Sequence, residues 1–453
     1  SGPGGYVAGI KAAQHGLKSV VIERERLGGI CLNWGCIPTK ALLRNAELYE
    51  ALKEGDAYGF SFEKLSFDSA KIVDRSRKVA DKMNRGVGSL FKKYKVDSIM
   101  GTGKLTAPGT IQVTAADGKA QTVKAKDIII ATGARPRAIP ALPTDGETVI
   151  TYRQAMELTK FPKKLLIVGA GAIGVEFAYF YATFGVEVHL VEMLPQLLPV
   201  EDTEIAEQLL RAFKKQGIHC YVGTQVKDFK AGKGKVEATL ATGDKGEKIT
   251  ADMALIAVGM QGNIENLGLE AVGVKTDRGF ITVDGQLRTN VPHVYAIGDV
   301  AGHQLLAHKA SAEGEVAVAA ITGHPRPALD YGQVPGCTYC QPQVASIGLT
   351  ERACKEKGLK FRVGRFPYAA NGKANGLKHL DGFVKLIFGE PYGQLLGAHM
   401  IGAESTELLA ELGLAMKLEA TNEEILATIH AHPTLSEMVF EATGQAYGES
   451  ANI

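Results

Sequence analysis

The chain has 453 residues, of which 45% are hydrophobic, and its 51 Lys and Arg residues against 49 Asp and Glu residues give a net charge of +2. A chain of this length exceeds what one hydrophobic core usually organises, so two to four domains are expected. The balanced charge gives no electrostatic case for nucleic acid or an anionic membrane, so small molecules or proteins are the expected partners.

The first residues of the chain read as a glycine-rich dinucleotide-binding turn that lacks its first glycine and the strand before it. We therefore expect the N-terminus to be clipped, with Gly2 and Gly5 as the remaining glycines of the turn. A helix is predicted over residues 6–16 and a buried strand over residues 19–22. Glu23 follows about 20 residues beyond the glycines, where a carboxylate can accept hydrogen bonds from ribose hydroxyls.

A pair of cysteines comes next, in the segment 28–40, which reads Gly-Gly-Ile-Cys-Leu-Asn-Trp-Gly-Cys-Ile-Pro-Thr-Lys. A disulfide between Cys31 and Cys36 closes a very small loop, so it removes little entropy from the unfolded chain and stabilises the fold little. Redox chemistry in a turn ended by Pro38 is the favoured use, and two unlinked cysteines are the alternative. The position just after a nucleotide-binding turn indicates a thiol pair delivered to a cofactor.

Helices are predicted over residues 41–53 and 69–94, and residues 98–130 alternate like strands. That run ends in a buried strand over residues 127–130. Thr132 and Gly133 follow, and the glycine lets the chain pass close to a ligand. Three prolines then mark a linker, at positions 136, 140 and 143.

A second dinucleotide-binding unit is complete in the sequence. A strand at residues 165–168, a turn at 169–174, a helix at 175–184 and a strand at 186–191 occur in the required order. This context favours dinucleotide binding over a tight structural turn. Glu192 ends the last strand, and its carboxylate suits a free 2′-hydroxyl and repels a 2′-phosphate, so NAD is preferred over NADP. The turn glycines are Gly169, Gly171 and Gly174.

The remaining chain contains a third strand that ends beside a candidate ligand-binding residue, followed by a region with a different pattern of strands and helices. A strand at residues 294–297 runs into Gly298 and Asp299, and such an Asp can bind a ribose or polyol hydroxyl or be a generic strand end. From about residue 333, strands around 343–348 and 382–388 and helices at 405–418 and 422–429 indicate an α+β domain.

The six cysteines are too few in a chain this long for a secreted disulfide framework, and no signal peptide or sustained apolar span is visible. A reducing compartment fits best. Cys337 and Cys340 have the spacing of half a zinc site, but no second Cys or His pair follows at a suitable distance. Ordinary packing is favoured for this pair, and no metal site is expected.

Two dinucleotide folds, an intervening dithiol and a terminal α+β domain together resemble the flavin-dependent pyridine nucleotide disulfide oxidoreductases. The resemblance spans essentially the whole chain, and its most specific segments are residues 28–40, 131–133, 298–299 and 430–437. It implies an α/β fold with two Rossmann-like dinucleotide-binding domains and a C-terminal α+β dimerisation domain. The implied division is an FAD-binding domain at 1–142, an NAD-binding domain at 143–265, a segment completing the FAD site at 266–332 and a dimerisation domain at 333–453.

The resemblance also implies an activity, the oxidation of protein-bound dihydrolipoamide, with FAD and NAD as cofactors. It makes Cys31 the sulfur that exchanges with the substrate and Cys36 the sulfur that faces the flavin. His432 is the implied acid/base in preference to His430, and Glu437 is its orienting carboxylate; this dyad is implied to serve the cysteines of the other subunit of a homodimer. The implied FAD residues are Gly2, Gly5, Glu23, Lys40, Thr132, Gly133 and Asp299, and the implied NAD-side residues are Gly169, Gly171, Gly174, Glu176, Glu192 and Gly259.

Three further expectations follow from the resemblance. Lys40 is expected to pair with Glu176 near the flavin, with a surface ion pair as the alternative. The expected partners are lipoyl domains of a 2-oxo acid dehydrogenase or glycine cleavage complex, in the bacterial cytoplasm or a mitochondrial matrix. Residues 258–263 depart from the family pattern because they lack its Arg and Pro. The contacts of this segment with NAD are therefore expected to differ from those typical of the family.

Three other functions are alternatives to this one. An NADPH-dependent disulfide reductase of the same fold needs cationic side chains for the 2′-phosphate, and Glu192 argues against it. A mercuric reductase is expected to carry a terminal cysteine pair, and residues 444–453 contain no cysteine. A structural docking subunit with a secondary redox centre is the alternative from a different class, and the intact dithiol counts against it.

Overall fold

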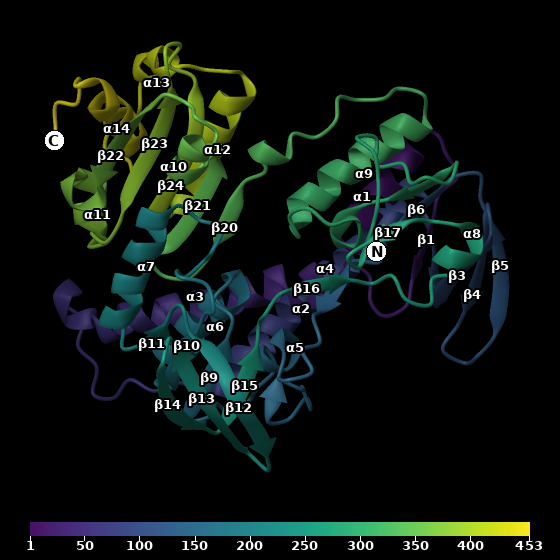
Figure 1. Cartoon of the computed structure of the whole chain (residues 1–453), viewed down its shortest axis with the longest axis horizontal. Helices are drawn as coiled ribbons and strands as arrows, with labels where there is room; N and C mark the ends of the chain where they lie inside the picture. The colour runs from purple at the N-terminus through teal and green to yellow at the C-terminus, as the bar shows by residue number, and fades with distance from the viewer. The chain divides into compact units, whose positions relative to one another are not determined.

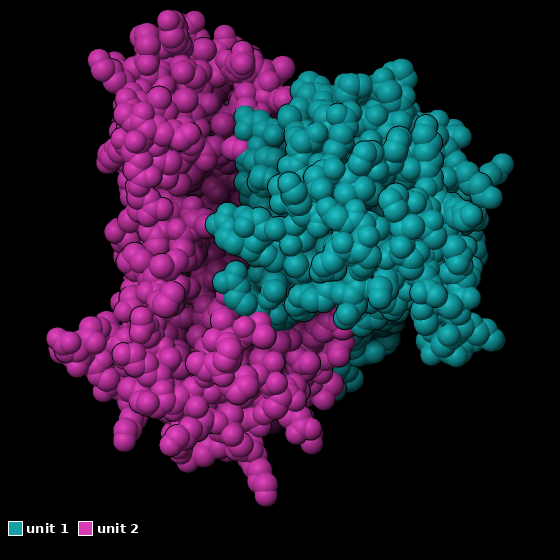
Figure 2. Space-filling view, turned by 45° about the vertical axis from the view of Figure 1, so that its right-hand side comes forward, with its two compact units in different colours: residues 1–42, 68–137, 259–331 teal, residues 43–67, 138–258, 332–453 magenta.

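The computed structural model describes residues 1–453 and divides into two compact units, which Figure 2 colours separately. Unit 1 comprises residues 1–42, 68–137 and 259–331, and unit 2 comprises residues 43–67, 138–258 and 332–453. Each unit is therefore assembled from three separate stretches of chain. The finer division into four domains stays a prediction.

Unit 1 contains two parallel strand pairs and the helices that cover them (Figure 1). Strand β1 (Val20–Glu23) pairs with β2 (Asp97–Met100), and β6 (Ile128–Ile130) pairs with β19 (Val294–Ala296). Helix α1 (Pro3–Gln14) packs along α9 (Ala307–Ile321). The other helices of this unit are α2 (Gly29–Trp34), the first part of α3 (Cys36–Lys53), α4 (Ser69–Tyr94) and α8 (Leu269–Val272), with a 3-10 turn η2 (Gly298–Ala301).

Short antiparallel strands complete unit 1. Strands β3 (Thr102–Ala107), β4 (Thr110–Thr114) and β5 (Ala120–Lys124) form a meander before β6. Strand β7 (Ala134–Pro136) pairs with β16 (Met260–Gly262), and β17 (Thr276–Asp277) pairs with β18 (Phe280–Ile281).

Helix α4 shows why the long periodic segment folds as predicted. The Asp68 carboxylate accepts a hydrogen bond from the Lys71 N–H at 3.1 Å and so caps the first turn. The buried side chains of the helix, which include Val73, Ala80 and Val87, recur at seven-residue intervals and form one apolar stripe. The predicted bounds of 69–94 are confirmed.

The nucleotide-binding part of unit 2 is a parallel sheet with strand order β11-β10-β9-β15-β8. A three-stranded antiparallel meander packs its apolar side chains with those of the sheet, in a cluster that includes Leu166, Val191 and Leu240. The sheet strands are β8 (Val149–Ile150), β9 (Lys164–Val168), β10 (Glu187–Val191), β11 (His219–Tyr221) and β15 (Met253–Ile256). The meander is β12 (Gln225–Gly232), β13 (Lys235–Thr242) and β14 (Lys245–Ala251), and the helices are α5 (Tyr152–Ala155), α6 (Ala172–Thr183) and α7 (Thr203–Lys215).

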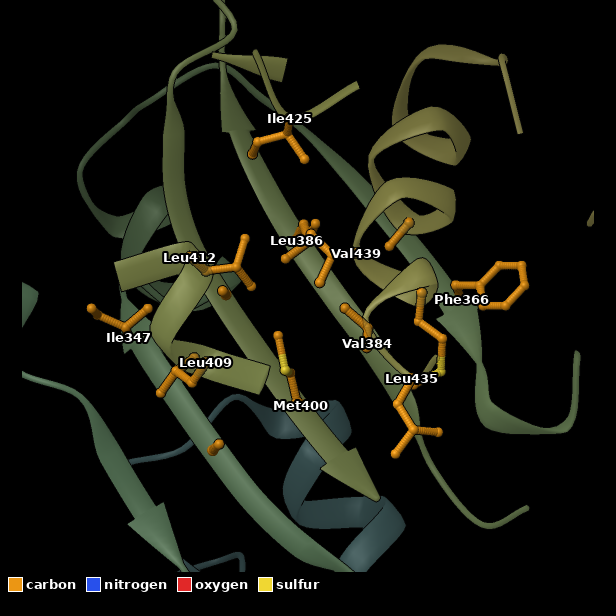
Figure 3. Close-up of a cluster of buried hydrophobic side chains, with 14 of the residues drawn as sticks. Ile347, Phe366, Val384, Leu386, Met400, Leu409, Leu412, Ile425, Leu435 and Val439 are labelled. Carbon is orange, nitrogen blue, oxygen red and sulfur yellow. The ribbon is translucent and has the colours of Figure 1, made fainter. Parts of the chain in front are cut away.

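The C-terminal part of unit 2 is an antiparallel sheet with strand order β20-β21-β24-β23-β22. Helices α12 (Ser405–Lys417) and α14 (Glu437–Tyr447) pack on it, and Figure 3 shows their apolar side chains meeting those of the strands, as with Leu409, Val439 and Leu386. The strands are β20 (Gly336–Thr338), β21 (Gln343–Gly348), β22 (Phe361–Pro367), β23 (Phe383–Gly389) and β24 (Leu395–Gly402). The remaining helices are α10 (Glu351–Glu356), α11 (Gly372–Leu377) and α13 (Asn422–Ala427).

The predicted fold class is confirmed, with two corrections to the predicted elements. The cysteine segment is helical rather than a turn, because α2 ends at Trp34 and α3 begins at Cys36. Helix α6 begins at Ala172, so Gly174 lies inside its first turn rather than before it. No helix of the chain combines the length and apolar character needed to cross a membrane.

Candidate active site

Cys31 and Cys36 are in direct contact in unit 1. Cys31 lies within α2, and Cys36 is the first residue of α3. Their side chains are hydrogen-bonded to each other. That bond and burial raise the pKa of the Cys31 thiol, whereas the Lys40 ammonium acts to lower it.

The two sulfur atoms have different electrostatic surroundings. Cys36 begins an 18-residue helix, and the positive end of a helix favours a negative charge on a thiolate placed there. Cys31 lies in the first turn of the much shorter, six-residue helix α2, and the hydrogen bond with Cys36 raises its pKa. The pair can therefore hold one proton on Cys31 while Cys36 carries the thiolate.

The dithiol segment packs against the glycine-rich turn at the start of the chain. The Gly28 N–H donates a hydrogen bond to the Ser1 carbonyl oxygen at 3.0 Å. A Cβ built on Gly29 would lie 2.6 Å from the Gly2 Cα, so no larger residue fits between the two segments. This backbone contact places the cysteine pair next to the first dinucleotide turn.

Polar side chains fix the helix that carries Cys31. The buried Asn33 amide donates hydrogen bonds to the carbonyl oxygens of Leu27 and Gly29, both at 2.9 Å. Arg77 on α4 donates to the Asn33 carbonyl oxygen at 2.7 Å. Sequence reasoning missed Asn33 and Arg77, because a single Asn in a predicted turn and an Arg on an amphipathic helix carry no specific signal.

Glu23 and Glu192 occupy equivalent positions in the two dinucleotide folds. One oxygen of Glu192 accepts from the Ala170 N–H in the glycine turn at 2.8 Å, and the other accepts from the Leu194 N–H at 2.9 Å. Glu23 repeats this arrangement with the Ser1 nitrogen and the Glu25 N–H, both at 2.8 Å. Each acid thus ties its glycine turn to the end of the neighbouring strand.

The charge of Glu23 is favoured by these partners. Burial acts to raise the pKa of Glu23, but hydrogen bonds from Ser1 and from the Glu25 N–H hold that pKa below its usual value. An ionised carboxylate has about four lone-pair positions, and three are used here, by the Ser1 nitrogen, the Ser1 hydroxyl and the Glu25 N–H. The remaining position can accept a hydrogen bond from a ribose.

Both glycine turns have room for a pyrophosphate. No heavy atom lies within 4 Å of a Cβ built on Gly2 or on Gly171. Each of these glycines caps a 12-residue helix whose first turn contains no acidic residue. Helix N-termini of this kind bind phosphate through their free N–H groups, so the residues present fit FAD in unit 1 and NAD in unit 2.

The third glycine of the second turn serves packing. A Cβ on Gly174 would collide with the Gly169 carbonyl oxygen, so only glycine lets α6 start this close to β9. The equivalent Gly5 is less crowded, with its nearest neighbour, the Ala131 side chain, at 3.4 Å from a built Cβ.

Thr132 and Gly133 are held by the segment that follows β16. The Thr132 hydroxyl donates to the Asn263 carbonyl oxygen at 2.8 Å, and the Asn263 amide donates to the Thr132 carbonyl oxygen at 2.9 Å. The Asn263 N–H also donates to the Gly133 carbonyl oxygen at 2.9 Å. A Cβ on Gly262 would lie 2.5 Å from the Gly279 carbonyl oxygen, so the crowding explains why this position carries no side chain.

Asp299 lies on a buried polar cluster that sequence reasoning missed. Burial raises the pKa of Asp299, and Glu313 adds to this effect while Lys309 opposes it. Lys309 and Glu313 are fully buried and form an ion pair at 3.1 Å. Glu313 also accepts from the Gly298 N–H at 2.6 Å, so the pair fixes the backbone beside Asp299. The available signal was a Lys and a Glu four residues apart on a helix rich in alanine and valine.

His432 and Glu437 form a dyad in the C-terminal domain. The His432 Nδ1 and a Glu437 oxygen are 2.8 Å apart, and the other Glu437 oxygen accepts from the Thr434 N–H at 2.7 Å. Burial acts to raise the pKa of Glu437, but the Thr434 and His432 hydrogen bonds bring that pKa below its usual value. The His432 ring is 78% exposed, whereas the rival His430 is 6% exposed and is bound to Glu411 at 2.7 Å.

The remaining predicted residues lie as follows. Lys40 is on α3 in unit 1, beside the cysteine pair. Glu176 is buried on α6 in unit 2 and accepts a hydrogen bond from the Tyr339 N–H at 2.9 Å. Gly259 begins the last stretch of unit 1, and its carbonyl oxygen accepts from the Arg137 N–H at 3.0 Å. The Lys40–Glu176 pair stays a prediction.

Known proteins resemble this chain over its full length. Residues 1–314 match the family described as pyridine nucleotide-disulphide oxidoreductase, and residues 334–443 match the dimerisation domain of that family. The chain is 50% identical to a dihydrolipoyl dehydrogenase of Rhizobium etli, with 100% of this chain and 98% of the relative covered. It is also 50% identical to a dihydrolipoyl dehydrogenase of Zymomonas mobilis, with 99% and 97% covered. Among solved structures, LpdA from Mycobacterium tuberculosis is similar, with a TM-score of 0.91, 28% identity, and 98% of this chain and 97% of that chain covered.

Proposed function

This chain belongs to the pyridine nucleotide-disulphide oxidoreductase family, and we propose that it is a dihydrolipoyl dehydrogenase, which oxidises dihydrolipoamide to lipoamide and reduces NAD+. Its cofactors are FAD and NAD. The observation that carries the proposal is the contact between Cys31 and Cys36 beside the first dinucleotide turn. A pair of exchanging thiols at that position can pass two electrons between a dithiol substrate and a flavin.

The thiol exchange starts from the disulfide form of the pair. A substrate thiol gives its proton to His432, and the resulting thiolate attacks the Cys31 sulfur, because the thiolate is the nucleophile. The Cys31–Cys36 bond breaks, and its electron pair leaves on Cys36, where the helix N-terminus favours the thiolate.

The mixed disulfide is then resolved by the second substrate thiol. That thiol attacks the substrate sulfur bound to Cys31, and its proton passes to the departing Cys31 sulfur; the attack closes the cyclic disulfide and releases Cys31 as a thiol. The substrate has lost two electrons and two protons, and the cysteine pair has gained the two electrons. Bound FAD and NAD+ supply the carrier and the final hydride acceptor for these electrons.

His432 suits the proton steps because an imidazole titrates near neutral pH, and Glu437 on Nδ1 leaves Nε2 for the substrate. In the family resemblance this dyad serves the cysteines of the other subunit. The dimerisation domain supports a homodimer, and the exposure of His432 in a single chain supports a role toward a second copy.

Glu192 supports the choice of NAD over NADP. Its carboxylate keeps two lone-pair positions for a ribose and carries a negative charge where NADP has a phosphate. The lipoyl domains of a 2-oxo acid dehydrogenase or glycine cleavage complex are the proposed partners. The bacterial origin of the similar proteins supports a cytoplasmic location.

Steady-state turnover separates this function from its rivals. We expect dihydrolipoamide with NAD+ to support rapid NADH formation and NADP+ to be a poor acceptor. Turnover of glutathione disulfide with NADPH, in the absence of dihydrolipoamide oxidation, would indicate the NADPH-dependent reductase instead. Absence of turnover with both substrate pairs in flavin-loaded protein would favour the docking subunit.

A further inference from the structure

One side of the parallel sheet in unit 2 carries a cluster of potential metal ligands at its edge. Glu187 and His189 alternate along β10, so their side chains lie on the same face. His219 on β11 is the register partner of His189. One ligand atom from each of these three residues lies within 4.8 Å of the other two. Strands β9, β10 and β11 are labelled in Figure 1.

The two imidazole rings are stacked. The ring centroids of His189 and His219 are 4.5 Å apart with an interplanar angle of 16°. The His189 Nε2 lies 2.9 Å from a Glu187 oxygen, and the His189 Nδ1 lies 3.1 Å from the Tyr221 hydroxyl. His189 is buried, whereas Glu187 and His219 are exposed.

Two imidazoles and a carboxylate are the ligand set that late first-row divalent metals prefer. We propose that Glu187, His189 and His219 bind a divalent transition-metal ion of the zinc type, with water in the fourth position. The site uses none of the residues assigned to the oxidoreductase reaction, so this proposal does not depend on the proposed function.

The His189 Nε2 lies 2.9 Å from a Glu187 oxygen, so the two groups share one proton. A metal replaces the proton that His189 and Glu187 share.

Tyr221 orients the buried ligand. When the His189 Nε2 binds a metal, its Nδ1–H can donate to the Tyr221 hydroxyl oxygen, which lies in reach at 3.1 Å. Metal-binding histidines commonly have such a partner on the second ring nitrogen. Donor atoms about 2.0–2.1 Å from a tetrahedral zinc ion are about 3.4 Å apart, so the longest separation in the cluster must shorten by up to roughly 1.4 Å. The exposed side chains of Glu187 and His219 can make this movement.

Lys164 opposes the metal. Its ammonium is 2.8 Å from the same Glu187 oxygen that faces His189. A divalent cation must therefore compete with this ion pair for the carboxylate. Removal of the Lys164 charge should strengthen metal binding, a result that a purely structural hydrogen-bond cluster does not predict.

The cluster is at the end of the sheet away from the dinucleotide turn. Glu187 and His219 are the first residues of their strands, whereas the glycine turn follows the last residue of β9. At about 3.3 Å per residue, Glu187 is roughly 16 Å along β10 from Glu192. Metal binding should therefore leave the apparent affinity for NAD+ unchanged.

The test is calorimetric titration of Zn2+ into tag-free, oxidised, FAD-loaded enzyme, in which the Cys31–Cys36 disulfide offers no thiolate. Wild type should bind one Zn2+ per chain at this site. His219→Gln and Glu187→Gln should abolish that binding, and Tyr221→Phe should weaken it about tenfold. Lys164→Gln should strengthen it. His324→Gln, at an exposed histidine far along the chain, is the matched control and should bind as wild type does.

Three outcomes would overturn the proposal. The first is no saturable Zn2+ binding by wild type, and the second is binding that survives His219→Gln. The third is competition between Zn2+ and NAD+, which would place the metal elsewhere. The exposed positions of Glu187 and His219 keep these variants foldable, and thermal unfolding provides the check: Zn2+ should raise the melting temperature of wild type and not that of His219→Gln.

Discussion

The equivalent positions of Glu23 and Glu192 lead to a paired prediction. Hydrogen bonds to charged groups contribute about 1.5–3 kcal/mol, so loss of one from the Glu192 carboxylate to a ribose hydroxyl should raise the KM for NAD+ by about 10- to 150-fold. Glu192→Gln makes this change with little change in shape. Glu23→Gln should loosen the flavin by a similar factor and leave the KM for NAD+ unaltered.

Both glutamine substitutions should also lower the free energy of unfolding. Glu192 accepts from two backbone N–H groups, at 2.8 and 2.9 Å, and a glutamine offers one oxygen, so its NH2 must face one of these donors. A buried donor without an acceptor costs about 1–3 kcal/mol. Glu192→Gln is therefore expected to lower the midpoint of urea unfolding even without NAD+.

Steady-state kinetics and flavin retention on dialysis measure the two effects. Glu207→Gln on α7 is the matched control, because its surface pair with Arg211, at 3.9 Å, contributes little. An unchanged KM in Glu192→Gln, or loss of flavin from Glu192→Gln in place of Glu23→Gln, would refute the assignment of the two acids.

Three further variants are predicted. Cys31→Ser should retain flavin, show a long-wavelength absorption from the Cys36 thiolate and lose lipoamide turnover. If Cys36→Ser shows this absorption band and Cys31→Ser does not, the roles assigned to the two cysteines are reversed. Subunit exchange between Cys31→Ser and His432→Gln proteins should recover about a quarter of wild-type activity, since about half the dimers are hybrids with one intact site; verified exchange without recovery would place both elements in one chain. Burial raises the pKa of Glu201 from 4.5 to about 7, so the folded state binds more protons and stability falls as pH rises through this window. Glu201→Gln should remove this pH dependence. Its free energy of unfolding in urea, relative to that of wild type, should therefore rise by about 2–3 kcal/mol between pH 5 and pH 8.

Elements with a strong periodic pattern of apolar residues were predictable from sequence. Helix α4 has a capping Asp68 and an apolar stripe, and both signals are local. The second dinucleotide fold likewise has its strand, glycines and acid in order. The cysteine segment was predicted as a turn, because Gly35 and Pro38 are turn residues, but both are compatible with helix ends.

Partners far apart in sequence could not be predicted. The Asn263 contacts to Thr132 and the cluster of Glu187 with His219 each depend on which strands pack together. Single residues of these types are common on surfaces. His432 and Glu437 were predictable because they are five residues apart in a segment typical of the family.

Anaerobic titration of the oxidised, FAD-loaded enzyme with dihydrolipoamide, followed by flavin and long-wavelength absorbance, tests the central claim most directly. The account predicts a spectral change complete near one equivalent of dihydrolipoamide per chain, reversed by NAD+ and not by NADP+. A spectrum that does not respond to dihydrolipoamide, in protein that NADPH reduces readily, would contradict it.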